Sequence, residues 1–206
     1  TVLAEQFSVG GTAVAVAHEA IRADHLEAST SKEIELLAGS QVIATALPGA
    51  SIGLGCPFTP ARKLLDAGCG VAIASDWNPG SAPMGDLMVQ ASVLATYEKL
   101  SNAEVLAGIT TRAAAALGLK DRGKLTAGSL ADFNIYDTNH FNEVFYQQGM
   151  MKPAQVWKNG KQVDPLREEL PTAQPLTDEL RPAYFEAITP LKSQLDSIQF
   201  EPQEIL

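Results

Sequence analysis

The chain has 206 residues, of which 24 are acidic and 15 basic, so its formal net charge is −9. This charge, with no basic cluster larger than the pair Arg62 and Lys63, argues against a nucleic-acid partner. No apolar run approaches the ~20 residues that cross a bilayer, so a membrane partner is not expected either. Cys56 and Cys69 lack paired metal-ligand spacing, which excludes a disulfide scaffold or a cysteine zinc finger and favours a cytoplasmic protein with reduced thiols.

The first 118 residues alternate short apolar runs with helical patterns. Four units of about 30 residues follow one another, the size of a strand–helix repeat. Strands are expected near Val2 and Leu3 and over 22–26, 41–47 and 71–74; helices over 12–21, 31–37 capped by Ser31, 60–67, 85–98 and 102–117. Residues 48–59 are expected to form a Pro/Gly-rich loop. Apolar strands between helices predict an α/β fold with a parallel sheet covered on its faces.

Beyond Gly118 the pattern becomes rich in β-structure. Residues 130–136 alternate, and Asn159 and Gly160 between two short runs indicate a hairpin over 154–158 and 161–163. From Asp164 onward the chain carries 9 acidic and 3 basic residues, six of the twelve prolines and no glycine, with one possible helix over 184–198. The expected division is therefore 1–118, a small β-rich portion over 119–163, and an acidic tail over 164–206.

Functional groups in a parallel α/β fold gather where strands end. Asp76 follows the run 71–75 directly, where it could bind a metal, accept a proton from water or cap a helix. Asn78, Gly80 and Ser81 come next; they could bind a carboxylate, or form a Pro-Gly turn that satisfies its own backbone. His25 lies at another strand end.

Glu5 follows the first strand and is a further candidate for the same rim, or a solvated charge. His18 and His140 are assigned to structure or solvent, and both cysteines to packing. The sequence contains no His-x-His pair, serine-hydrolase elbow or phosphate loop.

An ordered set of motifs resembles one enzyme family over about residues 1–163. The set comprises Ala-Glu-Gln-Phe at 4–7, Ala-Asp-His-Leu-Glu at 23–27, Leu-Pro-Gly-Ala at 47–50, Ser-Asp-Trp-Asn-Pro-Gly-Ser at 75–81, Gly-Ser-Leu-Ala-Asp-Phe at 128–133 and Val-Trp-Lys-Asn-Gly at 156–160. Together they resemble the carboxy-terminal half of imidazolonepropionases, which belong to the metal-dependent amidohydrolase superfamily. The resemblance implies half of a (β/α)8 TIM-like barrel, about four βα units, and part of a small β-sandwich domain.

The resemblance implies a hydrolase of histidine degradation. Such an enzyme adds water across the C–N bond of the cyclic amide 4-imidazolone-5-propanoate, a small-molecule substrate, and releases N-formimidoyl-L-glutamate. One divalent ion, zinc or iron, supplies hydroxide near neutral pH. The chain would then need its amino-terminal half, or a homodimer partner, and would be inactive alone.

The resemblance also implies roles for single residues. Asp76 matches a residue that binds the metal and takes up the proton of its water, His25 one that polarises the substrate carbonyl, and Glu5 one that contacts the imidazolone ring. Asn78, Gly80 and Ser81 match the loop that holds the propionate. Leu3 stands where the family has a metal-binding histidine. A catalytically inactive binding domain and a cyclic amidohydrolase of different substrate are the alternatives.

Overall fold

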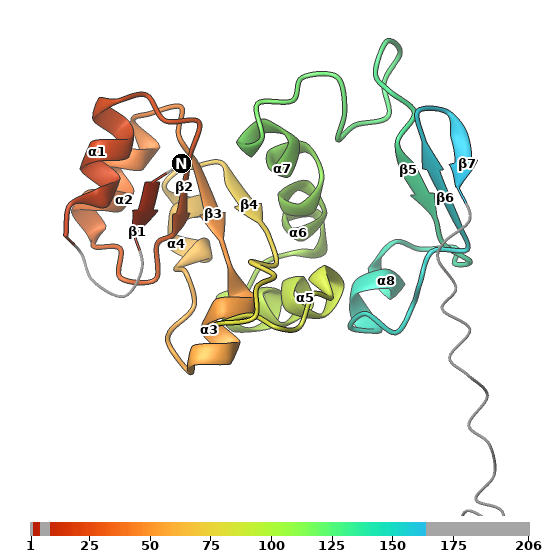
Figure 1. Ribbon diagram of the computed structural model, residues 1–206, viewed down its shortest axis with the longest axis horizontal. Coiled ribbons are helices and arrows are strands. Elements are labelled where there is room, and N and C mark those ends of the chain that lie inside the picture. Colours follow the sequence, from red (N-terminus) through yellow and green to blue (C-terminus); the bar gives the residue numbers. More distant parts are fainter. Residues whose placement is uncertain (1, 5–8, 164–206) are drawn as a thin grey trace, which may run out of the picture. The chain divides into compact units, whose positions relative to one another are not determined.

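A computed structural model describes residues 2–4 and 9–163 of the chain, and these lie in one compact unit, Thr1–Pro165. Its first part is a parallel sheet of four strands, β1 (Val2–Ala4), β2 (Arg22–His25), β3 (Ile43–Ala46) and β4 (Val71–Ile73), in the order β1-β2-β3-β4 (Figure 1). All three pairings are parallel. The four expected strands and the expected parallel sheet are therefore confirmed.

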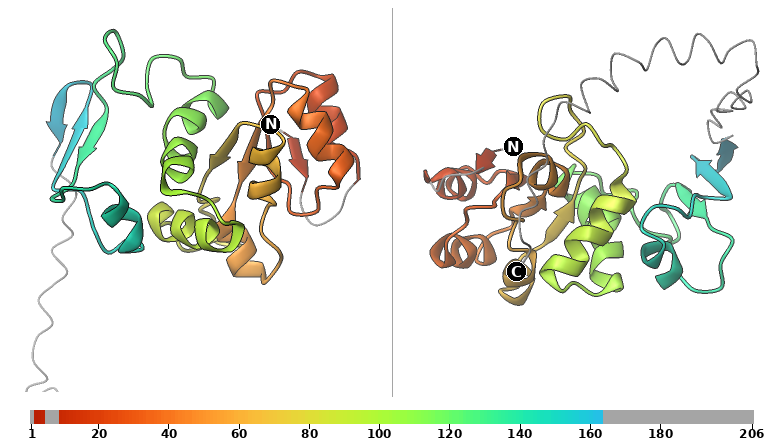
Figure 2. Two further views of the ribbon diagram at one scale, coloured as in Figure 1. Left: turned by 180° about the vertical axis from the view of Figure 1, so that it is seen from behind. Right: turned by 90° about the horizontal axis from the view of Figure 1, so that it is seen from below.

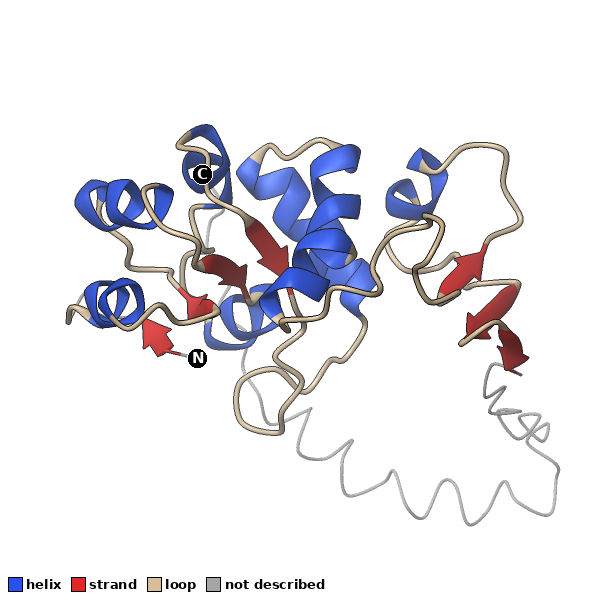
Figure 3. Ribbon diagram, turned by 90° about the horizontal axis from the view of Figure 1, so that it is seen from above, coloured by secondary structure: helices blue, strands red, loops and turns tan. Residues whose placement is uncertain are grey.

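Helices surround this sheet (Figure 3). Along the chain they are α1 (Gly11–Ala17), α2 (Ser31–Ala38), α3 (Pro48–Leu54), α4 (Ala61–Asp66), α5 (Leu87–Glu98), α6 (Asn102–Ile109) and α7 (Thr111–Ala116). Among the described helices, none is long and apolar enough to cross a membrane.

One face of the sheet packs on these helices through small and β-branched side chains. Ala23, Ala44 and Val71 lie side by side in register, and Ile73 contacts α6 where Gly108 leaves room for it. Leucines from several helices complete this core: Leu37, Leu64 and Leu94. The row on the opposite face, Asp24–Thr45–Ala72, is buried as well, so the sheet is covered on both sides, as parallel sheets usually are.

The second part is a three-stranded antiparallel sheet, in the order β5 (Phe133–Ile135), β6 (Gln155–Lys158), β7 (Lys161–Val163) (Figures 1 and 2). Helix α8 (Asn142–Tyr146) lies in the connection between β5 and β6. The hairpin predicted at Asn159 and Gly160 is confirmed, since both residues have positive φ, 52° and 72°. The buried Ser92 hydroxyl of α5 donates a hydrogen bond to the Phe145 carbonyl at 3.0 Å, which joins α8 to the helices of the first part.

Several expected elements have to be corrected. The region 48–59 is not all loop, because Pro48 stands at the first turn of α3, where a missing N–H costs nothing. Thr30, not Ser31, caps α2: its hydroxyl accepts from the Glu33 N–H at 3.4 Å, and the Glu33 carboxylate accepts from the Thr30 N–H at 2.8 Å.

Other helix boundaries also differ from expectation. The helix expected over 12–21 ends at Ala17, since His18 leaves helical geometry with φ −102° and ψ 13°. The expected helix 102–117 is two helices, because Thr110 leaves helical geometry with φ −124° and ψ −91°. Helix α5 begins at Leu87, not at Gly85, since the Asp86 carboxylate caps it by accepting from the N–H groups of Met88 and Val89. Helix α8 was not expected, and the expected helix 184–198 lies outside the described residues.

A salt bridge connects α4 to the start of α6. The Arg62 guanidinium donates two hydrogen bonds to the Glu104 carboxylate, at 3.0 and 3.1 Å. The Ser101 N–H donates to the same carboxylate at 2.8 Å and completes a capping box at the start of α6. The Arg62 hydrogen bonds first, and the Ser101 N–H second, lower the pKa of Glu104 to about 2.

We predict that Glu104 makes the fold sensitive to acid. Its pKa is lower in the folded chain than the ordinary 4.5, so its contribution to stability is complete above about pH 4.5 and is lost as the pH falls towards 2. The slope of the unfolding free energy against pH reports how many protons the chain takes up when it unfolds. In Glu104→Gln this number should be lower than in the wild type by up to about one proton in this pH window. Urea unfolding at a series of pH values measures the slope. Glu35→Gln, on an exposed face of α2, is the control; equal slopes for Glu104→Gln and the wild type would contradict the prediction.

Candidate functional site

The candidate site lies at the carboxyl edge of the parallel sheet. His25 is the last residue of β2, and Asp76 comes three residues after β4 ends. Since β3 lies between these strands, the two strand ends are separated by about 10 Å. The structure thus places His25 and Asp76 at the same edge, as the sequence predicted. Glu5 lies outside the described residues.

Asp76, Asn78, Gly80 and Ser81 form one tight loop held by the Asn78 side chain. The Asn78 amide donates to the Asp76 carboxylate oxygen Oδ2 at 3.0 Å and to the Asp76 carbonyl at 2.5 Å. Its Oδ1 accepts from the N–H groups of Gly80 and Ser81, both at 2.9 Å. The structure therefore brings together four of the predicted residues, and the turn satisfies its own backbone donors.

Helix α3 packs directly against the backbone of this loop. A Cβ on Gly53 would lie 1.8 Å from the Ser81 carbonyl oxygen, and one on Gly49 would lie 2.5 Å from that of Ser75. Only glycine allows a helix backbone to approach the loop so closely. The four-residue spacing of the two glycines puts them on one face of α3, a signal that the sequence interpretation missed.

Both strand ends use left-handed backbone geometry. Asp76 has φ 55°, and His25 and Leu26 have φ 73° and 70°. Such conformations are costly for residues other than glycine and often occur where a side chain must be aimed at a functional site. The buried Thr59 hydroxyl donates to the His25 carbonyl and fixes that turn from the segment before α4.

Glu27 is a buried carboxylate beside His25 that the sequence interpretation did not select. Its Oε1 lies 3.4 Å from His25 Nδ1, and the side chains of Glu27 and His25 are 5% and 12% exposed. The backbone reversal at His25 and Leu26 makes this approach possible, because residues two apart in an extended strand point the same way but lie too far apart. A carboxylate at Nδ1 orients an imidazole ring.

Asp24 and Arg22 form an ion pair on the sheet face that also carries Thr45. Arg22 Nε lies 3.0 Å from Asp24 Oδ1, and Asp24 is 7% exposed. Leu3, where the resembling family has a metal ligand, pairs in register with Asp24 through the backbone. Among the described residues, no group of three or more His, Cys, Asp or Glu side chains could hold a metal ion. Asp76 alone does not make a metal site, so the described residues do not fit a complete one.

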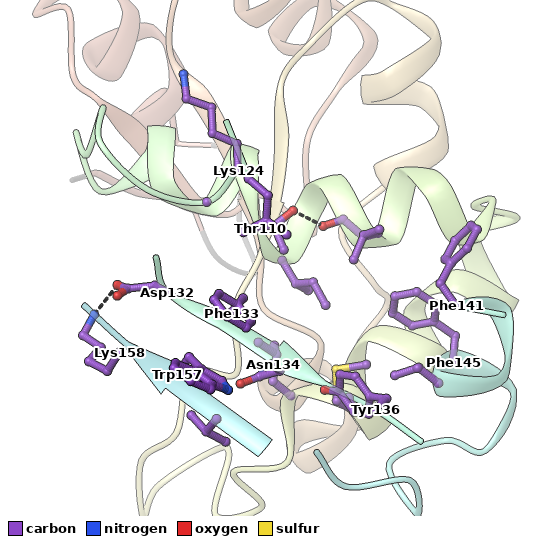
Figure 4. A pocket seen from close by; sticks show the side chains of 18 residues that line it. Thr110, Lys124, Asp132, Phe133, Asn134, Tyr136, Phe141, Phe145, Trp157 and Lys158 are labelled. Atoms are coloured by element: carbon purple, nitrogen blue, oxygen red, sulfur yellow. Dashed lines mark hydrogen bonds and ion pairs between the residues drawn. The ribbon is translucent and has the colours of Figure 1, made fainter. Parts of the chain in front are cut away.

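A separate cavity of about 760 Å³ lies between α5 and α6 on one side and the β5–β6 sheet and α8 on the other (Figure 4). Its lining is mainly apolar and includes Phe133 and Trp157, whose rings stack at 5.6 Å. At its margin the Asn159 N–H and the Lys158 ammonium lower the pKa of Asp132. The cavity contains none of the sequence-predicted site residues.

Comparison with known proteins gives two kinds of match. Residues 3–164 match the amidohydrolase family. The imidazolonepropionase of Deinococcus radiodurans is 42% identical over 161 residues, which are 78% of this chain and 40% of that protein. That of Paracoccus denitrificans is 44% identical over 148 residues, 71% of this chain and 37% of that protein. The chain therefore spans about 40% of the length of these curated relatives.

Solved structures match over a similar share. An adenosine deaminase from Xanthomonas campestris with bound zinc has a TM-score of 0.65 and 25% identity, over 86% of this chain and 43% of its own. An atrazine chlorohydrolase variant from Arthrobacter aurescens complexed with zinc and atraton has a TM-score of 0.59 and 21% identity, over 81% of this chain and 40% of its own. The second likeness concerns the fold alone.

We predict that the glycine face of α3 is required for the loop. Gly53→Ala would normally stabilise a helix, but here the new methyl meets the Ser81 carbonyl, so the variant should lose about 1–3 kcal/mol of unfolding free energy. Urea unfolding measures the loss. Gly39→Ala is the matched control, because its Cβ would meet only ordinary contacts at 3.7 and 3.8 Å, and it should change stability by less than about 0.5 kcal/mol. A Gly53→Ala variant as stable as the control would refute the packing argument.

Proposed function

Because the chain belongs to the amidohydrolase family, we propose that it is the carboxy-terminal portion of an imidazolonepropionase. The observation that carries this proposal is the identity of 42% with the Deinococcus radiodurans enzyme over 161 residues, which are 78% of this chain. The Asp76–Ser81 loop at the carboxyl edge of the sheet supports it. The four parallel strands would then be half of an eight-stranded barrel, since such a barrel takes about 250 residues.

The proposed reaction is the hydrolysis of 4-imidazolone-5-propanoate to N-formimidoyl-L-glutamate. Water adds to the lactam carbonyl carbon, the ring C–N bond breaks, and the ring nitrogen receives a proton. In this proposal Asp76 accepts the proton of the attacking water and returns it to the leaving nitrogen. The His25 imidazole donates a hydrogen bond to the carbonyl oxygen, where negative charge develops.

The remaining predicted residues would hold the substrate. Glu5 would contact the imidazolone ring, and the Gly80 and Ser81 N–H groups would face the propionate. In the present geometry those two N–H groups donate to Asn78 Oδ1, so a substrate carboxylate would share these donors with that oxygen. Asn78 belongs to the same proposed substrate loop.

A divalent ion, zinc or iron, would supply an activated water in the complete enzyme. The described residues offer Asp76 but no group of three ligands. The other ligands of the ion would therefore come from residues outside the described ones. This observation favours a second candidate, a catalytically inactive amidohydrolase-like binding domain. A hydrolase of another cyclic amide is the third.

The test compares the chain alone with the full-length protein that contains it. The absorbance of 4-imidazolone-5-propanoate should disappear with the full-length protein and persist with the 206-residue chain, which lacks a complete site. In the full-length protein, Asp76→Asn should lower kcat at least about 100-fold, because it removes the proton acceptor. Asp137→Asn, an exchange in the loop after β5, is the control and should retain full activity.

Each other outcome favours a different candidate. A full-length protein that binds the substrate without consuming it would favour the inactive binding domain. A full-length protein that does not hydrolyse this substrate but hydrolyses another cyclic amide would favour the third candidate, a hydrolase of different specificity. Full activity of Asp76→Asn would exclude Asp76 as the proton acceptor.

A further inference from the structure

The two carboxylate oxygens of Asp76 have different surroundings. Oδ2 accepts hydrogen bonds from Asn78 Nδ2 at 3.0 Å and from the Ser81 hydroxyl at 3.3 Å. No described residue donates a hydrogen bond to Oδ1. Among the described residues, Oδ2 is therefore held by two donors of the loop, and Oδ1 meets no donor.

The orientation of the Asn78 amide follows from its own contacts. Two backbone N–H groups, those of Gly80 and Ser81, donate to one atom of this amide, so that atom must be the oxygen. The NH2 group must then point to Asp76 and Ser81, with Nδ2 3.1 Å from the Ser81 hydroxyl oxygen. Rotating Asn78 away would break all of these bonds at once.

The loop backbone is fixed on both sides of this network. Asp76 has the unfavourable φ of 55°, and the bond from Asn78 Nδ2 to its carbonyl compensates for that conformation. The carbonyls of Ser75 and Ser81 rest on Gly49 and Gly53 of α3. The carboxylate direction is thus set before any ligand arrives.

We propose that Asn78 and Ser81 are positioning residues that hold Asp76 by its Oδ2 atom and leave Oδ1 as the oxygen that meets the reacting water. This inference rests on the proposed function, in which Asp76 is the proton acceptor. It gives Asn78 a role in catalysis through Asp76, in addition to its place in the substrate loop.

The positioning role and a substrate contact predict different kinetics. A group that orients the proton acceptor contributes mainly in the transition state, so its loss lowers kcat. A group that only grips the propionate contributes equally before and during the reaction, so its loss raises KM. The division of the effect between kcat and KM therefore separates the two roles.

Asn78→Asp is the sharpest variant for the full-length protein. The new carboxylate still accepts from the Gly80 and Ser81 N–H groups, so the turn is retained, but it donates nothing to Asp76 and repels it. Because Asn78 also belongs to the substrate loop, KM should rise as well, but we expect the larger effect in kcat, a fall of about 10- to 100-fold. Ser81→Ala removes only one donor to Oδ2, and its kcat should fall about three- to tenfold. Asn142→Asp, the same exchange at an exposed position of α8, is the control.

A second measurement needs neither substrate nor metal. In the 206-residue chain, NMR should find that the Asn78 side-chain NH2 exchanges with solvent at least about tenfold more slowly than the exposed Asn142 NH2, and that Asp76→Ala removes this protection. Equal exchange rates in the wild-type chain would overturn the network.

A KM increase of tenfold or more with unchanged kcat in Asn78→Asp would overturn the positioning role. A wild-type full-length protein that leaves 4-imidazolone-5-propanoate intact would refute the proposed function itself, whereas an active one with unchanged kcat in both variants would refute only this inference.

Discussion

The contact of helix α3 with the loop after β4 is the constraint on which the candidate site depends. Two glycines four residues apart let the helix backbone touch the carbonyls at both ends of the Asp76 loop. Any side chain at Gly53 would push the loop away from the sheet edge. The position of Asp76 relative to β2 and His25 is therefore set by helix packing, and the loop's own hydrogen bonds set only the direction of its carboxylate.

The sequence predicted the sheet and the site loop well because their signals are local. Apolar runs marked all four strands, and the Asp-x-Asn-Pro-Gly-Ser string at 76–81 marked a compact polar turn at a strand end. What it could not predict depends on contacts between distant segments. Helix α3 was hidden because Pro48, Gly49 and Gly53 have low helix propensity, and their value lies in packing against a loop about 25 residues later.

The Glu27–His25 contact escaped prediction for a related reason. Alternation along a strand places residues two apart on the same face without contact, and only two consecutive left-handed residues, His25 and Leu26, let the carboxylate approach the ring. Leu26 is fully buried, and Thr59 fixes the His25 carbonyl, so tertiary packing maintains this costly backbone. No property of the local sequence predicts such a reversal at non-glycine residues.

The buried polar atoms near the sheet edge bear on whether the described unit is complete. The hydroxyls of Ser29, Thr45 and Ser51 are buried, and the described residues provide no hydrogen bond for them. Burying such groups without partners costs free energy, and native proteins rarely leave them so. The three hydroxyls lie on β3 or on the segments that follow β2 and β3. Groups from outside the described residues would satisfy these hydroxyls, which agrees with a chain that spans about 40% of its relatives and with the proposal that it is half of a barrel.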